Sequence, residues 1–156
     1  MWRILTGAAL ALMLDQGSKY YVLHVLDLLG ARVIGVAPPV LQFRLAWNRG
    51  VNFGLFSNDY EVMRWVLVSL AVVISVWIFR WARHLPVPSG QFLAGLVIGG
   101  ALGNVVDRLA YGAVADFLNM SCCGLKNPYA FNFADVSIFV GAFGLVLFSN
   151  KLDKNG

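Results

Sequence analysis

Four apolar stretches divide the chain and leave one long polar loop between the first two. They run from Ile4 to about Leu29, from about Val62 to Trp81, from about Phe92 to Leu109, and from about Asp135 to Phe148. A helix needs roughly 17–25 residues to cross the hydrocarbon core of a bilayer. The first two stretches are long enough, and the last two reach this length only with their polar ends. We therefore expect four transmembrane helices, with those polar ends at a membrane boundary.

The loop over residues 30–61 has a different pattern. Pro38-Pro39 breaks any helix there, and from Leu41 to Trp47 every second residue is apolar. This alternation predicts a strand with one apolar face, and Asn48-Arg49-Gly50 favours a turn after it. We expect a small sheet on the membrane surface. Its apolar face contacts either lipid and substrate or the ends of the helices, and the pattern leaves both interpretations open.

The N-terminal stretch also resembles a secretory signal peptide, because Arg3 precedes eleven mostly apolar residues. No A-x-A cleavage site follows, however, and apolar character resumes at Tyr20. Three more apolar stretches come after it. A retained first helix is the better interpretation.

Composition supports a membrane protein. Of the 156 residues, 59% are hydrophobic and 13% are charged, whereas a soluble domain carries about 25% charged residues. A cytosolic enzyme is therefore disfavoured. The net charge of +4 comes from scattered Lys and Arg residues, so no basic patch indicates nucleic acid. Basic residues near the termini and between the second and third stretches favour cytoplasmic termini. These residues are Arg3, Arg80, Arg83, Lys151 and Lys154.

Several polar residues lie within the apolar stretches, where a charge costs about 2.5–3.5 kcal/mol at the bilayer centre. Asp15 and Lys19 are four residues apart and can pair on one helix face. Either this pair positions the helix or it has a direct functional role. Asn104, Asp107 and Arg108 follow at spacings of three and four, which predicts one shared face and favours a polar scaffold. We expect Asp107 to pair with another helix.

Small residues mark the third stretch as a packing element. Gly95, Gly99 and Gly103 recur every fourth residue, and glycines at this spacing let another helix approach closely. We expect these glycines to pack rather than to take part in chemistry.

The chain has few candidates for catalysis other than carboxylates. Cys122 and Cys123 are adjacent and poorly placed to bridge each other. No His or Cys pattern has zinc-ligand spacing, and neither H-E-x-x-H nor G-x-S-x-G occurs. We therefore expect neither a metal nor a cofactor.

Asp116 and Asp135 are the candidate chemical groups. Asp116 lies eight residues after Arg108 and Asp135 begins the fourth stretch, so both lie near one membrane face and can meet. Two carboxylates about 4 Å apart repel by roughly 4 kcal/mol at an effective dielectric of 20, which is about three pKa units. One of them then keeps a proton beside an ionised partner. Such a pair can activate a water and polarise a carbonyl, which is aspartyl hydrolysis.

Four blocks of sequence carry a resemblance to one family. Asp15-Gln16-Gly17-Ser18-Lys19 resembles a D-Q-x-[ST]-K block, and residues 48–54 resemble an N-x-G-x-x-F block. Residues 99–117 and 131–138 resemble a long Gly- and Asp-containing block and an F-N-x-A-D block. In this order, over about residues 4–150, they resemble the lipoprotein signal peptidases (signal peptidase II), the bacterial membrane aspartyl peptidases.

The resemblance implies an all-α polytopic membrane protein with four transmembrane helices and a small extracytoplasmic β-cradle. It implies one integral membrane peptidase domain over residues 1–156, in the bacterial cytoplasmic (inner) membrane, with cytoplasmic termini and an active site near the extracytoplasmic face. It further implies that the substrates are prolipoproteins, which are cleaved just before the diacylglyceryl-modified cysteine. We expect a monomer that contacts membrane lipid and no nucleic acid.

The family's functional residues map onto this chain block by block. Its catalytic dyad corresponds to Asp116 and Asp135. The residues expected to bind substrate or support the dyad are Asp15, Lys19, Asn48, Gly50, Asn104, Asp107, Arg108, Asn132 and Ala134. Asn52 departs from the family, which usually has a small apolar residue there. Residues 121–124 belong to no block. Both departures predict altered loop contacts rather than lost activity.

Two other classes of protein stay open on the residues alone. A small transporter or channel would line its path with intramembrane charges, but it does not explain two carboxylates at one face beside Asn132. A non-enzymatic membrane scaffold would use the glycine face and tolerate replacement of Asp116 and Asp135 by Asn. A different type of intramembrane aspartyl protease is not indicated, because no G-x-G-D motif occurs.

Overall fold

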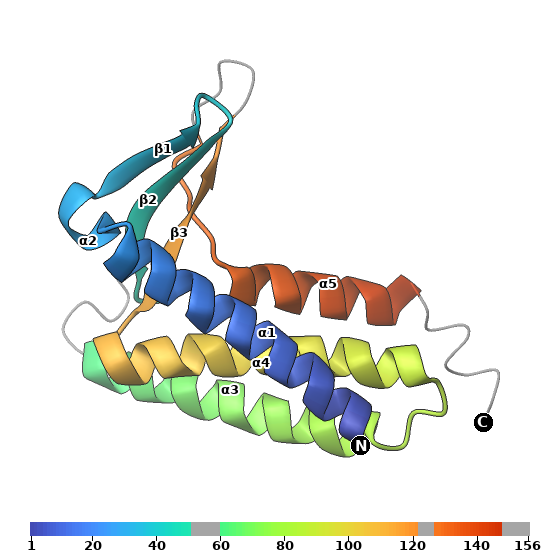
Figure 1. Cartoon of the computed structure of the whole chain (residues 1–156). Coiled ribbons are helices and arrows are strands. Elements are labelled where there is room, and N and C mark those ends of the chain that lie inside the picture. The colour runs from blue at the N-terminus through green and yellow to red at the C-terminus, as the bar shows by residue number, and fades with distance from the viewer. Residues whose placement is uncertain (51–59, 122–126, 148–156) are drawn as a thin grey trace.

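The structure is a computed structural model that describes residues 1–50, 60–121 and 127–147. Four long helices lie alongside one another, and a small sheet stands at one end of them (Figure 1). The long helices are α1 (Trp2–Tyr20), α3 (Tyr60–Ala82), α4 (Pro88–Tyr111) and α5 (Phe133–Leu147). A π-helical segment, η1 (Tyr21–Val25), and a single-turn helix, α2 (Leu28–Ala31), lead from α1 into the sheet. The N-terminus lies at the end far from the sheet (Figure 1).

Helix α4 is the centre of the bundle and contacts α1, α3 and α5. Its glycines allow the closest of these contacts. A Cβ atom on Gly95 would collide with the carbonyl oxygen of Ile4, and one on Gly99 would collide with that of Ala8. The prediction that these glycines serve helix packing is confirmed, because α1 crosses α4 with backbone against backbone.

The helix boundaries differ from those expected. Helix α4 begins at Pro88, four residues before the expected start, because proline suits the first position of a helix. It ends at Tyr111, and the next residue, Gly112, has a φ of 76°, the left-handed conformation that often ends a helix. The α-helical part of the first stretch ends at Tyr20 instead of near Leu29.

Two of the described helices, α3 and α4, are long and apolar enough to cross a membrane by length and composition. Helix α5 is apolar but has only 15 residues, and the expected end of its stretch at Phe148 lies outside the described residues. Helices α3 and α5 present large apolar side chains outward, among them Trp65, Val73, Trp77, Phe139 and Phe143. An apolar surface of this extent fits a protein surrounded by lipid.

The sheet has three antiparallel strands in the order β1-β2-β3. They are β1 (Val33–Ala37), β2 (Leu41–Asn48) and β3 (Val114–Met120). Strand β2 and the presence of a small sheet confirm the prediction, whereas the sequence pattern did not indicate the positions of β1 and β3. In the β2–β3 pairing, Phe43 lies opposite Leu118 and Ala46 opposite Asp116, with an irregularity between them.

One face of the sheet covers the end of the helices. Phe43 packs edge to face on Phe117, with ring centroids 5.6 Å apart. Both side chains belong to a hydrophobic cluster that also contains Val22, Leu23 and Leu28 from η1 and α2. The apolar face of β2 therefore contacts helix ends, which is one of the two interpretations that the sequence left open. Asp116 lies on β3, so the sheet carries one of the two candidate catalytic carboxylates.

Candidate active site

Asp135 is held in the first turn of α5 by a reciprocal pair of hydrogen bonds with Asn132. The backbone N–H of Asp135 donates to Asn132 Oδ1 at 2.9 Å, and the N–H of Asn132 donates to Asp135 Oδ2 at 3.3 Å. Two residues at this spacing form a capping box, which satisfies two N–H groups that a helix start leaves without partners. The Asn-x-x-Asp spacing in the sequence therefore determines where this carboxylate points.

The same asparagine contacts Asp116. The side-chain Nδ2 of Asn132 donates to Asp116 Oδ1 at 2.6 Å and lies 3.3 Å from Asn104 Oδ1. Asn132 is fully buried, and Asp116 is 4% exposed. One side chain thus joins β3 to the start of α5, and it brings the two aspartates into one site.

Helix α4 and the end of β2 complete the polar surroundings. Asn104 Nδ2 donates to Asp135 Oδ1 at 3.1 Å. The guanidinium of Arg108, four residues further on, interacts electrostatically with both aspartates and donates to the Asn104 carbonyl at 3.2 Å. The side chain of Asn48 hydrogen-bonds to Asp116. Asn48, Asn104 and Arg108 therefore each interact with at least one of the two aspartates.

Gly50 holds Asn48 in place. Its backbone N–H donates to Asn48 Oδ1 at 2.9 Å, which leaves the Asn48 amide nitrogen to donate to Asp116. The φ of Gly50 is 86°, a conformation that other residues rarely adopt. A Cβ atom there would also collide with Leu67 on α3. The positive φ is the stronger reason for glycine at this turn, since the end of the flexible Leu67 side chain can move aside.

A buried ion cluster lies behind the dyad. Lys19 Nζ is 2.7 Å from Asp15 Oδ2 and 2.6 Å from Asp107 Oδ2, and none of the three side chains is more than 4% exposed. The predicted pairing of Asp15 with Lys19 is confirmed, and so is the expectation that Asp107 pairs with another helix. The cluster joins α1 to α4 in a place where unpaired charges would be strongly unfavourable.

This ion cluster also holds the backbone next to each aspartate. Asp107 Oδ2 accepts a hydrogen bond from the N–H of Ala115 at 3.0 Å, and Asp15 Oδ1 accepts one from the N–H of Ala134 at 2.9 Å. Ala115 and Ala134 are the residues directly before Asp116 and Asp135. The two buried carboxylates of the cluster thus each fix the backbone one residue away from a member of the dyad.

The structure corrects one expectation about α4. Asp107 points toward Lys19 on α1, whereas Asn104 and Arg108 point toward the dyad. The three residues therefore do not share one face. Asp107, three residues after Asn104, is rotated from it by about 60° to one side of the helix, and Arg108, four residues after Asn104, is rotated to the other side. Asp107 and Arg108 therefore reach different neighbouring elements.

Gln16 and Asn119 were not among the predicted site residues. Gln16 Nε2 donates to Asp107 Oδ1 at 2.9 Å and to the Gly103 carbonyl at 3.2 Å. Asn119 is fully buried, and its Nδ2 donates to the carbonyls of Asn127 and Tyr129 at 2.8 and 2.7 Å. Gln16 lies within the first sequence block, and this position could have identified it as a site residue. Asn119 lies outside every block. Asn52 and Cys122-Cys123 fall outside the described residues.

Burial and charge make the dyad suited to acid–base chemistry. Burial and, to a smaller extent, the nearby negative charge of Asp135 raise the pKa of Asp116 from an ordinary value of 3.8 to about 6. Hydrogen bonds from Asn48 and Asn132 act in the opposite direction. A carboxyl group with this pKa can hold a proton close to neutral pH beside a second carboxylate.

An apolar groove of about 300 Å³ leads to this site between α3, α4 and α5. Its polar end is formed by Asn104 and Arg108, and the remaining lining is mostly apolar, from Leu67, Leu70, Ala71, Ile74, Val97, Ala101 and Ile138. Within the described ranges, no group of three His, Cys, Asp or Glu side chains could hold a metal ion. The site can therefore offer two carboxylates, their amide partners and an apolar approach.

Comparison with known proteins gives a consistent result. The family described as signal peptidase (SPase) II matches residues 7–151. A lipoprotein signal peptidase of Methylobacterium sp. (strain 4-46) is 43% identical over 92% of this chain and 86% of its own length. One from Alteromonas mediterranea is 38% identical over 99% of this chain and 86% of its own length.

Solved structures share the fold. Two structures of a bacterial membrane enzyme superpose with TM-scores of 0.76 and 0.77 at 23% identity. Each comparison covers 97% of this chain and at least 90% of the solved chain. With the family match over nearly its whole length and close relatives of one kind, the chain belongs to the signal peptidase II family.

Proposed function

We propose that this chain is an aspartyl endopeptidase that removes the signal peptide of prolipoproteins, with Asp116 and Asp135 as the catalytic dyad. The observation that carries the proposal is the position of Asn132, which hydrogen-bonds to both carboxylates. Family membership supplies the substrate class, because the relatives are named lipoprotein signal peptidases. The bond cleaved is the one just before the diacylglyceryl-modified cysteine.

The reaction uses one protonated and one ionised carboxyl group. The ionised carboxylate takes a proton from water, and the oxygen of that water attacks the scissile carbonyl carbon. The protonated carboxyl hydrogen-bonds to the carbonyl oxygen and stabilises its developing negative charge. When the tetrahedral intermediate collapses, the C–N bond breaks and the leaving amine takes up a proton from the dyad. The raised pKa of Asp116 favours Asp116 as the partner that starts protonated.

The supporting residues act by position and charge. Asn104 and Asn132 orient the two carboxylates, and Asn48 with Gly50 orients Asp116 from the end of β2. Arg108 offsets part of the negative charge that the dyad carries. Asp15, Lys19, Asp107 and Ala134 form the buried layer that holds the backbone before each aspartate.

We also propose the placement in the membrane. Helices α1, α3, α4 and α5 cross the bacterial inner membrane, with the termini in the cytoplasm and the sheet and dyad at the extracytoplasmic face. The short connection between α3 and α4 supports this orientation, because Arg80 lies in the last turn of α3 and Arg83 follows the helix, and positive residues near short loops favour the cytoplasmic side. The sheet lies at the opposite end of the helices (Figure 1).

The substrate reaches the dyad from the lipid phase. Its signal helix lies along the apolar groove between α3, α4 and α5, and its acyl chains stay in the bilayer. The groove supports this path because its apolar wall ends at Asn104, which contacts Asp135. All of these groups come from one chain, so we propose that a monomer over residues 1–156 acts as a single domain without a cofactor.

One assay tests the proposal. The purified protein is incubated with a prolipoprotein that carries the diacylglyceryl group and with the same precursor lacking it, and release of the signal peptide is measured. Only the lipidated precursor should be cleaved. Asp116→Asn and Asp135→Asn should each abolish cleavage while the protein still inserts and folds. Asp27→Asn is the matched control, since Asp27 is an exposed aspartate that only caps α2.

Two results would contradict the proposal. Robust cleavage by either dyad variant would remove the catalytic assignment. Preferential cleavage of the unmodified precursor would remove the substrate assignment. Cleavage by purified protein without any ion gradient would separate a peptidase from a transporter.

A further inference from the structure

Asn119, near the end of β3, is a fully buried polar side chain that the proposed mechanism does not use. Its Nδ2 donates to the backbone carbonyls of Asn127 at 2.8 Å and Tyr129 at 2.7 Å. Its Oδ1 accepts a hydrogen bond from Gln42 Nε2 at 2.8 Å and lies 3.5 Å from Ser121 Oγ. An asparagine amide has two N–H donors and one acceptor oxygen. All of them are therefore engaged within the protein.

The two carbonyls belong to the segment 127–131, which leads directly into Asn132. Among the described residues, the backbone of this segment pairs with β3 at Phe131 alone. The N–H of Phe131 donates to the Leu118 carbonyl at 3.0 Å, and its carbonyl accepts from the N–H groups of Leu118 at 2.8 Å and Phe117 at 3.0 Å. A single bridge fixes where the segment meets β3 but leaves its direction free. Asn119 attaches the segment at further points and so fixes its direction as well.

The next residue after the bridge is the asparagine that joins the dyad. Asn132 Nδ2 donates to Asp116 Oδ1 at 2.6 Å, and its backbone N–H donates to Asp135 Oδ2 at 3.3 Å. The capping box fixes Asn132 relative to α5 but not relative to β3, where Asp116 lies. Strand β3 therefore carries both one catalytic carboxylate and, three residues later, the amide that holds the segment before Asn132.

Gln42 determines which way the Asn119 amide points. It lies directly opposite Asn119 in the pairing of β2 with β3 and is half-buried. Its Nε2 donates to Asn119 Oδ1, so the Asn119 nitrogen faces the two carbonyls, which can only accept hydrogen bonds. Loss of the Gln42 amide would leave the Asn119 contacts in place but remove the bond that orients them.

We propose that Asn119 is a positioning residue of the active site, which fixes the segment 127–131 against β3 and thereby holds Asn132 against Asp116. This role rests on the proposed peptidase function and involves no contact with the substrate or the reacting atoms. It predicts that Asn119 affects catalysis only through Asn132.

Steady-state cleavage of a lipidated precursor by the full-length protein in detergent tests the role. Asn119→Ala should lower kcat about tenfold, because a small displacement of a positioned group is costly. KM should change less than twofold, since the apolar groove is untouched. Gln42→Met should lower kcat about threefold, because it removes only the orienting bond. Asn127→Ala is the matched control, since it keeps the carbonyl that Asn119 contacts, and it should change kcat less than twofold.

A double-variant cycle separates positioning from general destabilisation. If Asn119 acts through Asn132, adding Asn119→Ala to Asn132→Ala should lower kcat by less than a further twofold. A tenfold fall in both backgrounds would overturn the proposal, and so would a rise in KM with kcat unchanged in Asn119→Ala.

The titration of Asp116 gives a readout that does not need activity. The hydrogen bond from Asn132 lowers the pKa of Asp116, which is about 6 in the intact site. In protein labelled with [13C]aspartate, the carboxyl signal that Asp116→Asn removes should titrate at higher pH in Asn119→Ala, in the same direction as in Asn132→Ala. The facing charges of Asp135, Lys19 and Arg108 are unchanged in these variants.

The two readouts fail independently. If the unmodified protein does not cleave the precursor, the peptidase function fails, but the titration still tests whether Asn119 holds Asn132 in place. An unchanged midpoint in Asn119→Ala would overturn the positioning role even in an active enzyme. If Asn119→Ala does not fold, Gln42→Met takes its place in both experiments. An unchanged kcat and an unchanged midpoint in Gln42→Met would then overturn the proposal.

Discussion

Lys19 is the only cation that separates two buried carboxylates in the described part of the chain. Its Nζ lies 2.7 Å from Asp15 and 2.6 Å from Asp107. The substitution Lys19→Met keeps most of the length and apolar volume of the side chain but removes its charge. Asp15 and Asp107 then face each other behind the dyad, with no cation between them.

The geometry sets the size of the effect. Two oxygens that contact one nitrogen lie no farther apart than the sum of the two distances, about 5.3 Å. Two unit charges at that separation repel by about 3 kcal/mol at an effective dielectric of 20. Removing one partner from a buried ion pair typically costs about 3–5 kcal/mol. We therefore expect Lys19→Met to lower the free energy of unfolding by about 3 kcal/mol or more.

The assay is equilibrium unfolding in detergent micelles, followed by tryptophan fluorescence. Combining Lys19→Met with Asp107→Asn removes one of the two repelling charges and leaves an amide oxygen for the Ala115 N–H, so most of the lost stability should return. Arg44→Gln, an exposed charge, should change stability by less than about 0.5 kcal/mol. If the double variant is no more stable than Lys19→Met alone, carboxylate repulsion is not what Lys19 prevents.

The dyad should respond to pH and to loss of its shared asparagine. The pKa of Asp116 is about 6 in the folded protein and near 3.8 in the unfolded chain. The protonated carboxyl therefore stabilises the fold fully below about pH 4, and this contribution is lost as pH rises through 6. The free energy of unfolding should therefore fall less steeply between pH 4 and 7 in Asp116→Asn, and an unchanged slope would refute the raised pKa. Asn132→Ala removes the side-chain cap of α5 and the hydrogen bond to Asp116, so kcat for precursor cleavage should fall about 100-fold with little change in KM. Steady-state kinetics beside Asn127→Ala, a loop asparagine, tests this, and equal kcat values would contradict it.

Much of the fold could be anticipated from local patterns. The apolar stretches indicated the positions of four helices, and alternation over 41–47 indicated β2. Strand β3 gave no such signal, because all but two of its seven residues are buried and polar residues occur among them. Strand β1 is short and mostly exposed. For both strands, the partner across the sheet determines the structure more than the strand's own sequence does.

The sequence by itself determined which chemistry this protein has available. It placed carboxylates where charge is unfavourable, and it set Asp15 four residues before Lys19 and Asn132 three residues before Asp135. Those short spacings determine the ion pair and the capping box, since a helix brings such residues together wherever it forms. The four blocks that contain these residues, in their order along the chain, also indicated one family.

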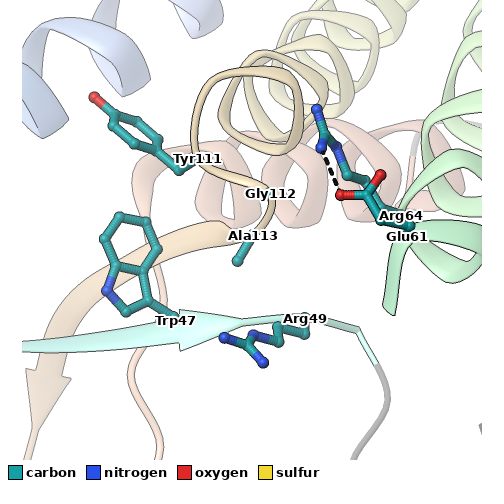
Figure 2. A pocket seen from close by; sticks show the side chains of 7 residues that line it. All are labelled: Trp47, Arg49, Glu61, Arg64, Tyr111, Gly112 and Ala113. Atoms are coloured by element: carbon teal, nitrogen blue, oxygen red, sulfur yellow. Dashed lines mark hydrogen bonds and ion pairs between the residues drawn. The ribbon is translucent and has the colours of Figure 1, made fainter. Parts of the chain in front are cut away.

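Only the tertiary structure decided which groups meet. Asn132 reaches Asp116 because β3 pairs with β2 next to the start of α5, and Asp107 reaches Lys19 because glycines let α1 lie against α4. A cavity lined by Trp47, Arg64 and Tyr111 (Figure 2) likewise depends on three elements, β2, α3 and α4. Contacts of this kind depend on how helices and strands pack, which residue spacing within one element does not specify.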